Sequence, residues 1–250
     1  MPSIAAAQEF RVYTTVRDVS AGQSAQPIVS RSLTLFRGGR SYDWLDDLGE
    51  VIVSDRVRGR SSVISRQLEG THVERDQIAH YLKVGRTEAT TYLTGVTEPS
   101  AREAIGFSLE PSLTAAFEPE LERLVLSGGG WTYTIQTAEP PDTAIVEAYL
   151  DYADRAAAMN FLFHPRANFP ALRQAANAEL RKVGRVPVSV TLESAMQPEL
   201  TLQAEHKYGW TLESFDRSRI RQWDLLLRPD SDKVRWMTLR SFQQQTVAAQ

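Results

Sequence analysis

The stretch LTLFRGGRSYDW, Leu33–Trp44, sets the pattern for the whole chain. Its Gly38-Gly39 pair lies between two runs of alternating residues. Both central residues of a two-residue hairpin loop need positive φ, which glycine adopts freely. Val51–Val53 and Ser62–Ile64 follow as two further short strands. Parallel neighbours would need long crossovers, so these closely spaced strands predict an antiparallel meander.

Strands with the same alternation recur along the rest of the chain. They are expected at Phe10–Val16, Leu121–Leu126, Trp131–Gln136, Val186–Leu192 and Leu200–Trp210. Each has an apolar face and a face rich in polar residues, which is the pattern of an antiparallel sheet with one solvated side. The sequence therefore predicts one sheet whose apolar side is covered by helices.

Helical periodicity indicates which segments cover the sheet. The three expected covering helices run over 72–94, 144–163 and 170–182. The first of them has Thr71 as N-cap and Glu74 at the third helical position, which fits a capping box. Ile105–Leu109 is expected to be a short strand.

The sequence thus predicts an α+β fold. The architecture is a single curved antiparallel sheet, half-barrel-like, with helices packed on its apolar concave face. One domain is expected over 1–250, because no linker or repeat interrupts the pattern. Phe215–Leu227 is predicted to be a further helix, and Thr238 caps a last short one, with fraying expected over 243–250. Residues 1–8 are expected to be flexible or the remnant of a signal peptide.

Composition excludes several classes of function. Hydrophobic residues make up 42% of the chain and charged residues 24%, as in ordinary globular proteins. The net charge of −3 provides no basic field for nucleic acid. The absence of cysteine excludes disulfides, thiolate metal sites and thiol nucleophiles. No apolar stretch approaches the ~20 residues that span a bilayer, so a membrane-spanning protein is not expected.

Ala5-Ala6-Ala7 before Gln8 is typical of the small-residue end of a secretory signal, with cleavage before Gln8. No basic or long apolar region precedes these residues, so a complete signal peptide is not expected. The pattern predicts a periplasmic or otherwise exported protein. A flexible alanine-rich tail on a cytoplasmic protein is the alternative.

Three expected strands carry an aromatic-x-aromatic pair, and a spacing of two puts both rings of a pair on one face. The pairs are Tyr42/Trp44, Trp131/Tyr133 and Tyr208/Trp210. On a concave face these rings would line a cavity for an apolar ligand, with Tyr O–H and Trp N–H groups as polar handles. The alternative is packing against the helices. Tyr152 and Met159 join the set from the helix over 144–163, and His206 is the best candidate for a polar group inside the cavity.

Other chemistry-bearing residues fit structural roles better. The histidines lack the spacing of a metal site. The carboxylates Asp43, Asp46, Asp47 and Glu50 could do acid–base work or hold Ca²⁺, but a solvated acidic turn fits them better. Ser127–Gly130 lacks the following helix that a phosphate-binding loop needs, and a hairpin turn is expected there. No catalytic residue, metal site or cofactor is therefore predicted.

The order of the segments carries a resemblance. The hairpin over Leu35–Asp43, the strands and helix after it, and the late run from Tyr149 to Leu227 resemble an uncharacterised family of exported bacterial proteins of planctomycete type. At the level of the fold, the chain is similar to the lipoprotein-carrier (LolA/LppX-like) half-barrel, in which helices plug the apolar concave face of a curved sheet. The resemblance implies the carriage of acyl chains or lipoproteins through the periplasm.

Three functions follow from these observations, in order. The first is a non-enzymatic binding or carrier protein for an apolar or lipid-like ligand held between the sheet and the covering helices. The second is a structural or protein-interaction module with a solid core. The third is an acid–base hydrolase that uses Asp43, Asp46 or His206. A hollow space between sheet and helices would favour the first.

Overall fold

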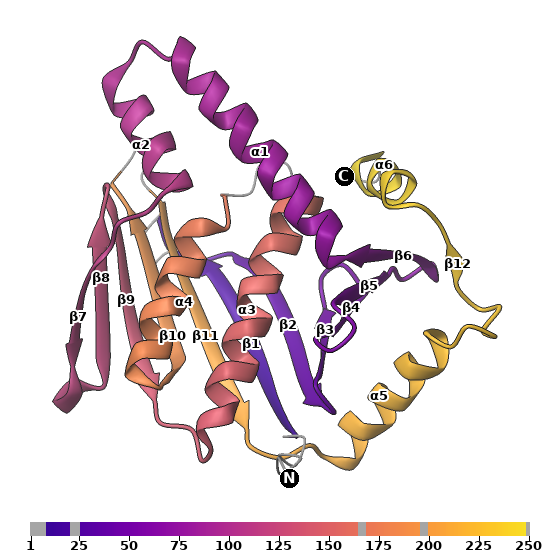
Figure 1. Cartoon of the computed structure of the whole chain (residues 1–250). Coiled ribbons are helices and arrows are strands. Elements are labelled where there is room, and N and C mark those ends of the chain that lie inside the picture. Colours follow the sequence, from indigo (N-terminus) through magenta and orange to yellow (C-terminus); the bar gives the residue numbers. More distant parts are fainter. Residues whose placement is uncertain (1–8, 21–25, 165–168, 196–199, 249–250) are drawn as a thin grey trace, which may run out of the picture. The chain divides into compact units, whose positions relative to one another are not determined.

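The computed structural model describes residues 9–20, 26–164, 169–195 and 200–248, with side chains as far as Gln245. Its strands are β1 (Phe10–Asp18), β2 (Ile28–Arg37), β3 (Arg40–Leu45), β4 (Glu50–Asp55), β5 (Arg60–Ile64), β6 (Glu69–Glu74), β7 (Thr114–Glu118), β8 (Arg123–Gly128), β9 (Trp131–Ala138), β10 (Val186–Ser194), β11 (Leu200–Gly209) and β12 (Arg235–Trp236). Its helices are α1 (Arg75–Gly95), α2 (Pro99–Leu109), α3 (Thr143–Phe163), α4 (Ala171–Val183), α5 (Ser214–Leu226) and α6 (Leu239–Ala248), with one 3₁₀ turn at Pro119–Leu121 (Figure 1).

One open sheet of 12 strands runs through the fold, in the order β12-β6-β5-β4-β3-β2-β1-β11-β10-β9-β8-β7. Successive strands from β2 to β6 pair antiparallel, as do β7 to β11 where they adjoin. The predicted α+β fold on a single, largely antiparallel sheet is confirmed. The exception is the short β12, which pairs parallel to β6 at the edge of the sheet.

The chain divides into two compact units, which are described in turn. The first comprises Met1–Thr15, Ser30–Gln77 and Lys207–Gln250, and the second comprises Val16–Val29 and Ile78–His206. The single domain expected over the whole chain stays a prediction. The predicted signal remnant before Gln8 lies outside the described residues. No helix among the described residues combines the length and apolarity needed to cross a membrane.

The first unit is built on the meander that the Gly38-Gly39 hairpin starts. Both glycines have positive φ, at 61° and 74°, and the register pairs Leu35 with Tyr42 across the turn. The apolar side of β2–β5 is covered by α5, whose Trp223 and Ile220 join Leu35 and Tyr42 in one buried cluster. The predicted helix over Phe215–Leu227 is therefore confirmed, and it covers this part of the sheet.

The capping box predicted at Thr71 and Glu74 is wrong, because those residues belong to strand β6. Thr71 and Val73 alternate with His72 and are buried against β5, so cross-strand pairing outweighs the local capping signal. The helix begins at Arg75 instead. The sequence pattern of a capping box was present, but a strand partner was available close along the chain.

Replacing Gly70 with alanine is expected to destabilise the first unit by about 1–3 kcal/mol, because overpacking a tight contact costs roughly that much. A Cβ atom at Gly70 would lie 2.7 Å from Cζ3 of Trp236 and 2.8 Å from Cγ1 of Val234. The β12 segment would have to shift. Urea unfolding measures the loss, with Gly95→Ala as the control, since nothing lies within 4 Å of a Cβ there. Equal stability of the two variants would contradict this packing.

The second unit packs α3 and α4 against the sheet around β10 (Figure 1). Asp142 begins α3 as predicted, because its carboxylate accepts a hydrogen bond from the amide N of Ala144 at 2.9 Å. The two helices are tied by Asp154, whose Oδ1 accepts from Asn177 Nδ2 at 2.7 Å and whose Oδ2 accepts from Arg181 at 2.8 Å. The helices predicted over 144–163 and 170–182 are confirmed.

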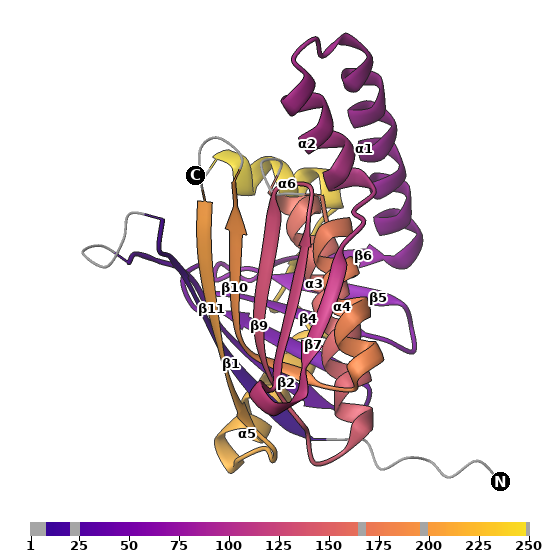
Figure 2. The same cartoon turned by 90° about the vertical axis from the view of Figure 1, so that its left-hand side faces the viewer.

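Two predictions for the second unit are wrong. The strand expected at Ile105–Leu109 is the end of α2, which the Glu98 carboxylate caps by accepting hydrogen bonds from the amides of Ser100 and Ala101. The helix expected over 72–94 was assigned to the cover of the sheet. Along the fully described α1 only Ile78 is buried, and α1 and α2 extend past the ends of β8–β10 (Figure 2).

Candidate functional site

The first predicted aromatic pair, Tyr42 and Trp44, packs against α5. Their ring centroids lie 6.1 Å and 6.2 Å from that of Trp223. The Tyr42 hydroxyl donates to Oδ1 of Asp224 at 3.0 Å, and the Trp44 indole N–H donates to Oδ1 of Asp46 at 2.6 Å. Burial, together with the nearby Asp224 carboxylate, raises the pKa of Tyr42 to about 12. Both polar handles of this pair therefore already have partners.

The pair Tyr208 and Trp210 lies at the end of β11 in the first unit. The two rings stack on one another, with centroids 4.9 Å apart. Trp210 keeps 37% of its surface exposed. A stacked, partly exposed pair of rings offers an apolar surface, but the structure brings Tyr208 and Trp210 into ring contact only with each other among the described contacts.

In the second unit, Trp131, Tyr133 and Met159 are buried, with at most 5% of each residue exposed. Tyr152 is half-buried beside Tyr149, the ring centroids being 6.2 Å apart. The Trp131 indole N–H is buried without a hydrogen-bond acceptor among the described residues. Burial raises the pKa of Tyr133. These side chains form part of a packed interior.

His206 is also buried in the second unit, with 5% of its surface exposed. The ring of Tyr149 meets it edge-on, with centroids 6.0 Å apart. Burial, assisted by the positive charge of Arg173, lowers the pKa of His206 to about 3. The imidazole is therefore neutral at physiological pH, as expected for a polar group in an apolar interior.

The carboxylates considered for acid–base chemistry are held in separate structural interactions. Asp43 is buried and accepts a hydrogen bond from the Thr34 hydroxyl at 2.8 Å. Asp46 accepts from the Trp44 indole, and Asp47 pairs with Arg31 at 2.7 Å. Glu50 has a pKa raised by burial. Nothing in these contacts joins two of the carboxylates as an acid–base pair.

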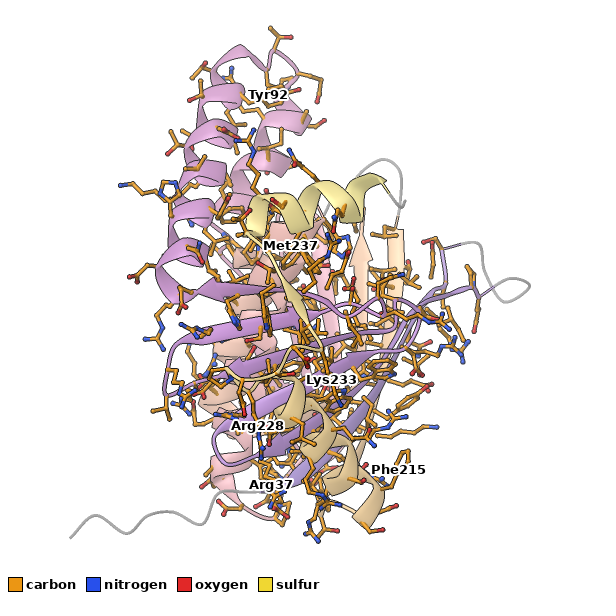
Figure 3. The ribbon with its side chains drawn as sticks, turned by 90° about the vertical axis from the view of Figure 1, so that its right-hand side faces the viewer. Arg37, Tyr92, Phe215, Arg228, Lys233 and Met237 are labelled. Carbon is orange, nitrogen blue, oxygen red and sulfur yellow. The ribbon has the colours of Figure 1, made fainter. Side chains whose placement is uncertain are left out.

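Arginine side chains line a hollow in the first unit, where β3–β6 meet the end of α5. Its volume is about 230 Å³. The charged residues that line it are Arg40, Arg58, Arg60, Arg228, Asp55 and Asp224. The uncharged ones are Val53, Ser62, His72, Leu227 and Pro229. Figure 3 shows Arg228 just after the end of α5, whose other end carries Phe215. We call this site the arginine hollow.

Strand register explains why these side chains share one face. One row across the sheet runs from Arg40 through Asp55 and Arg60 to Glu74. The neighbouring row, two residues along each strand, runs from Tyr42 through Val53 and Ser62 to His72. Registered neighbours in adjacent strands point to the same side of a sheet. The first row is charged, and the second lies between it and the apolar core under α5.

Arg40 is the best-paired cation of the arginine hollow. Its Nε donates to Oδ2 of Asp55 at 2.9 Å, and its Nη1 donates to Oδ1 of Asp224 at 3.2 Å. Asp224 also accepts from the Tyr42 hydroxyl. Arg60 pairs with Glu74 at 2.6 Å. These pairs fix the position of the sheet residues relative to the end of α5.

Ser62 and His72 meet across β5 and β6. The Ser62 hydroxyl and Nδ1 of His72 are 2.9 Å apart, and the His72 ring stacks on Trp236, with centroids 4.1 Å apart. Partial burial, and next the positive charge of Arg60, lower the pKa of His72. A neutral imidazole that is held on both sides gives the hollow a fixed polar wall.

None of the eleven residues that line the arginine hollow belongs to the aromatic set predicted from the sequence. A second hollow of about 250 Å³, lined by Val57–Gly59 and Glu74–Asp76, also lies outside that set and shares Arg58. The signal that was available is the turn DRVRGR, Asp55–Arg60, in which every second residue is an arginine. His72 escaped notice because it was assigned to a helix.

Comparison with known proteins adds no family to this description. No protein-family model matches the chain, and no curated protein matches it. Among the described residues, no group of three or more His, Cys, Asp or Glu side chains is placed to hold a metal ion. The case for a function therefore depends on the geometry of the chain itself.

Proposed function

We propose that this protein is a non-enzymatic binding protein whose arginine hollow receives a small amphipathic molecule. The observation that carries the proposal is the mixed lining of the hollow. Guanidinium groups lie on one side, and the apolar side chains of Val53, Leu227 and Pro229 complete the wall. Binding sites typically combine apolar walls with a few placed polar groups. The carboxylates that a hydrolase would need are engaged in separate structural contacts.

The ligand predicted from the sequence, an apolar or lipid-like molecule, fits this proposal through its apolar part. The aromatic residues predicted to line its cavity stay a prediction as ligand contacts. Export to the periplasm and the similarity to lipoprotein carriers also stay predictions. A periplasmic binding protein for an amphipathic molecule is compatible with each of them.

A protein-interaction module with a solid core is the second candidate function. The close burial of Trp131, Tyr133 and Met159 favours it, since rings that are fully packed have no free surface for a ligand. The two candidates differ in one measurable respect. A solid-core module binds no small molecule at the arginine hollow.

Filling the hollow tests the proposal. Leu227→Trp is expected to weaken binding of a small amphipathic molecule about tenfold or more, because the larger side chain occupies the space beside Arg228. The matched control is Leu225→Trp, two residues earlier in α5, where the side chain is 48% exposed and outside the hollow. Native mass spectrometry of protein purified from a bacterial extract, followed by ligand-observed NMR, measures the difference.

Circular dichroism of the two tryptophan variants verifies that both remain folded. Binding that is unchanged in Leu227→Trp, or lost equally in Leu225→Trp, would refute the arginine hollow as the ligand site. A protein that binds no small molecule in either measurement would favour the interaction module.

A further inference from the structure

We propose that the arginine hollow recognises an oxyanion, a carboxylate or a phosphate group, at one end of its ligand, and that Arg58 and Arg228 pair with it. This inference rests on the proposed function, because it concerns the ligand of the same hollow. It goes further by naming the chemical group that is recognised and the two residues that recognise it.

The two carboxylates of the hollow do not compete for those arginines to any great extent. Asp224 accepts hydrogen bonds from Arg40 and from the Tyr42 hydroxyl. Asp55 accepts from Nε of Arg40 at 2.9 Å and from the backbone amide of Arg58 at 2.9 Å. Burial opposes ionisation of Asp55, but its hydrogen bonds to Arg58 and Arg40 outweigh that effect and lower its pKa. The acidic groups are therefore charged and already neutralised by Arg40.

The cations that remain are Arg58 and Arg228. The Arg58 side chain is 72% exposed, and its Nε is 3.8 Å from Oδ2 of Asp55, beyond hydrogen-bond distance. Arg228 is exposed and has no side-chain hydrogen bond or ion pair among the described residues. A guanidinium group offers five N–H donors in a planar fork that matches carboxylate and phosphate oxygens. Most of that donor capacity is open in these two residues.

The other walls suit an oxyanion attached to a short apolar body. Ser62 and His72 present a fixed polar pair on the sheet, 2.9 Å apart, while Val53, Leu227 and Pro229 present carbon atoms. The volume of about 230 Å³ falls below the ~300–1,000 Å³ of pockets that enclose drug-sized molecules. The hollow therefore has room for a head group and a few carbon atoms, and a longer chain would extend out of it.

A structural role for Arg228 makes a different prediction. The residue follows the last turn of α5, where a cation interacts favourably with the negative end of the helix dipole. In that role Arg228 needs no ligand, and its removal changes stability rather than binding. Arg58 lies in the turn between β4 and β5 and has no such role. A double substitution of both residues, compared with a control on the same helix, separates the two explanations.

The experiment uses the full chain and four probes: hexyl phosphate, hexanoate, hexanol and inorganic phosphate. Isothermal titration calorimetry or two-dimensional NMR gives their affinities for the native protein, Arg58→Gln/Arg228→Gln and the control Arg221→Gln. Arg221 is an exposed arginine of α5 outside the hollow. We expect hexyl phosphate or hexanoate to bind about tenfold or more tightly than hexanol, because charge-assisted hydrogen bonds form only with the anions. The double variant should lose that advantage, and the control should keep it.

The outcomes separate the inference from the proposed function. Hexanol binding as tightly as the anions, or a double variant that loses no affinity for them, overturns the inference and leaves the proposed function standing. Inorganic phosphate binding as tightly as hexyl phosphate supports the oxyanion site and refutes the amphipathic ligand. Failure of all four probes to bind overturns both.

Discussion

Replacing Trp223 with alanine should lower the free energy of unfolding by about 3–5 kcal/mol, the usual cost of deleting a large buried aromatic side chain. Trp223 is 7% exposed, and its ring lies between α5 and the rings of Tyr42 and Trp44. Its removal would leave a cavity in the contact that holds α5 on the meander. Urea unfolding followed by far-UV circular dichroism measures the loss.

Leu225→Ala is the matched control for Trp223→Ala. Leu225 lies two residues further along α5 with 48% of its surface exposed, so its truncation should cost less than about 1 kcal/mol. A similar loss in the two variants would show that Trp223 does not anchor the helix. Because Asp224 and Leu227 lie in the same helical turn region and line the arginine hollow, Trp223→Ala should also weaken binding there.

Acidification should destabilise the protein through His206. Its pKa in the folded protein is about 3, below the ordinary value of 6.5. Between those pH values the unfolded chain binds a proton that the folded protein does not, so stability is full above pH 6.5 and is lost as the pH falls. The slope is about 1.4 kcal/mol per pH unit, or about 3 kcal/mol between pH 6.5 and pH 4.

Comparison with His206→Gln isolates that contribution from other titrating groups. The free energy of unfolding of the native protein, minus that of the variant, should fall by about 3 kcal/mol over the same interval. His80→Gln, which changes an exposed histidine of α1, should leave the pH dependence of the native protein intact. A difference between the native protein and His206→Gln that stays constant with pH would contradict the buried, neutral state of His206.

Local signals were sufficient for most of the fold. The Gly38-Gly39 hairpin was predictable because its turn chemistry and the alternation on both sides lie within about a dozen residues. The N-terminus of α3 was predictable because a single side chain, Asp142, supplies its cap. In both cases the residues that decide the structure are close together in the sequence, so no knowledge of distant partners was needed.

Signals that depend on distant partners were misleading. Thr71–Glu74 has the spacing of a capping box and also the alternation of a strand, and only its pairing with β5 decides between the two. The helix after it has an apolar stripe, yet its threonines turn their hydroxyls back to its own carbonyl groups, as Thr90 does to Arg86 at 2.8 Å. An apolar stripe predicts a helix, but it does not say which surface the helix covers.

The arginine hollow could not be predicted for the same reason. Its walls come from four strands and from the end of a helix about 150 residues later in the chain. The register of all four strands had to be known before Arg40, Asp55 and Arg60 could be placed in one row. The aromatic pairs were recognisable because both members lie on one strand. The guanidinium groups are neighbours only across strands.

Strand β12 has only two residues, but its position matters for the behaviour of the protein in a crowded cell. The amide of Arg235 donates to the carbonyl of Leu68 at 2.8 Å, and the amide of Met237 donates to that of Gly70 at 2.9 Å. Without this segment, β6 would present bare amide and carbonyl groups on which a second molecule could add a strand. The tail thus acts as a stopper against self-templated polymerisation, and its loss would endanger solubility before it endangered the core.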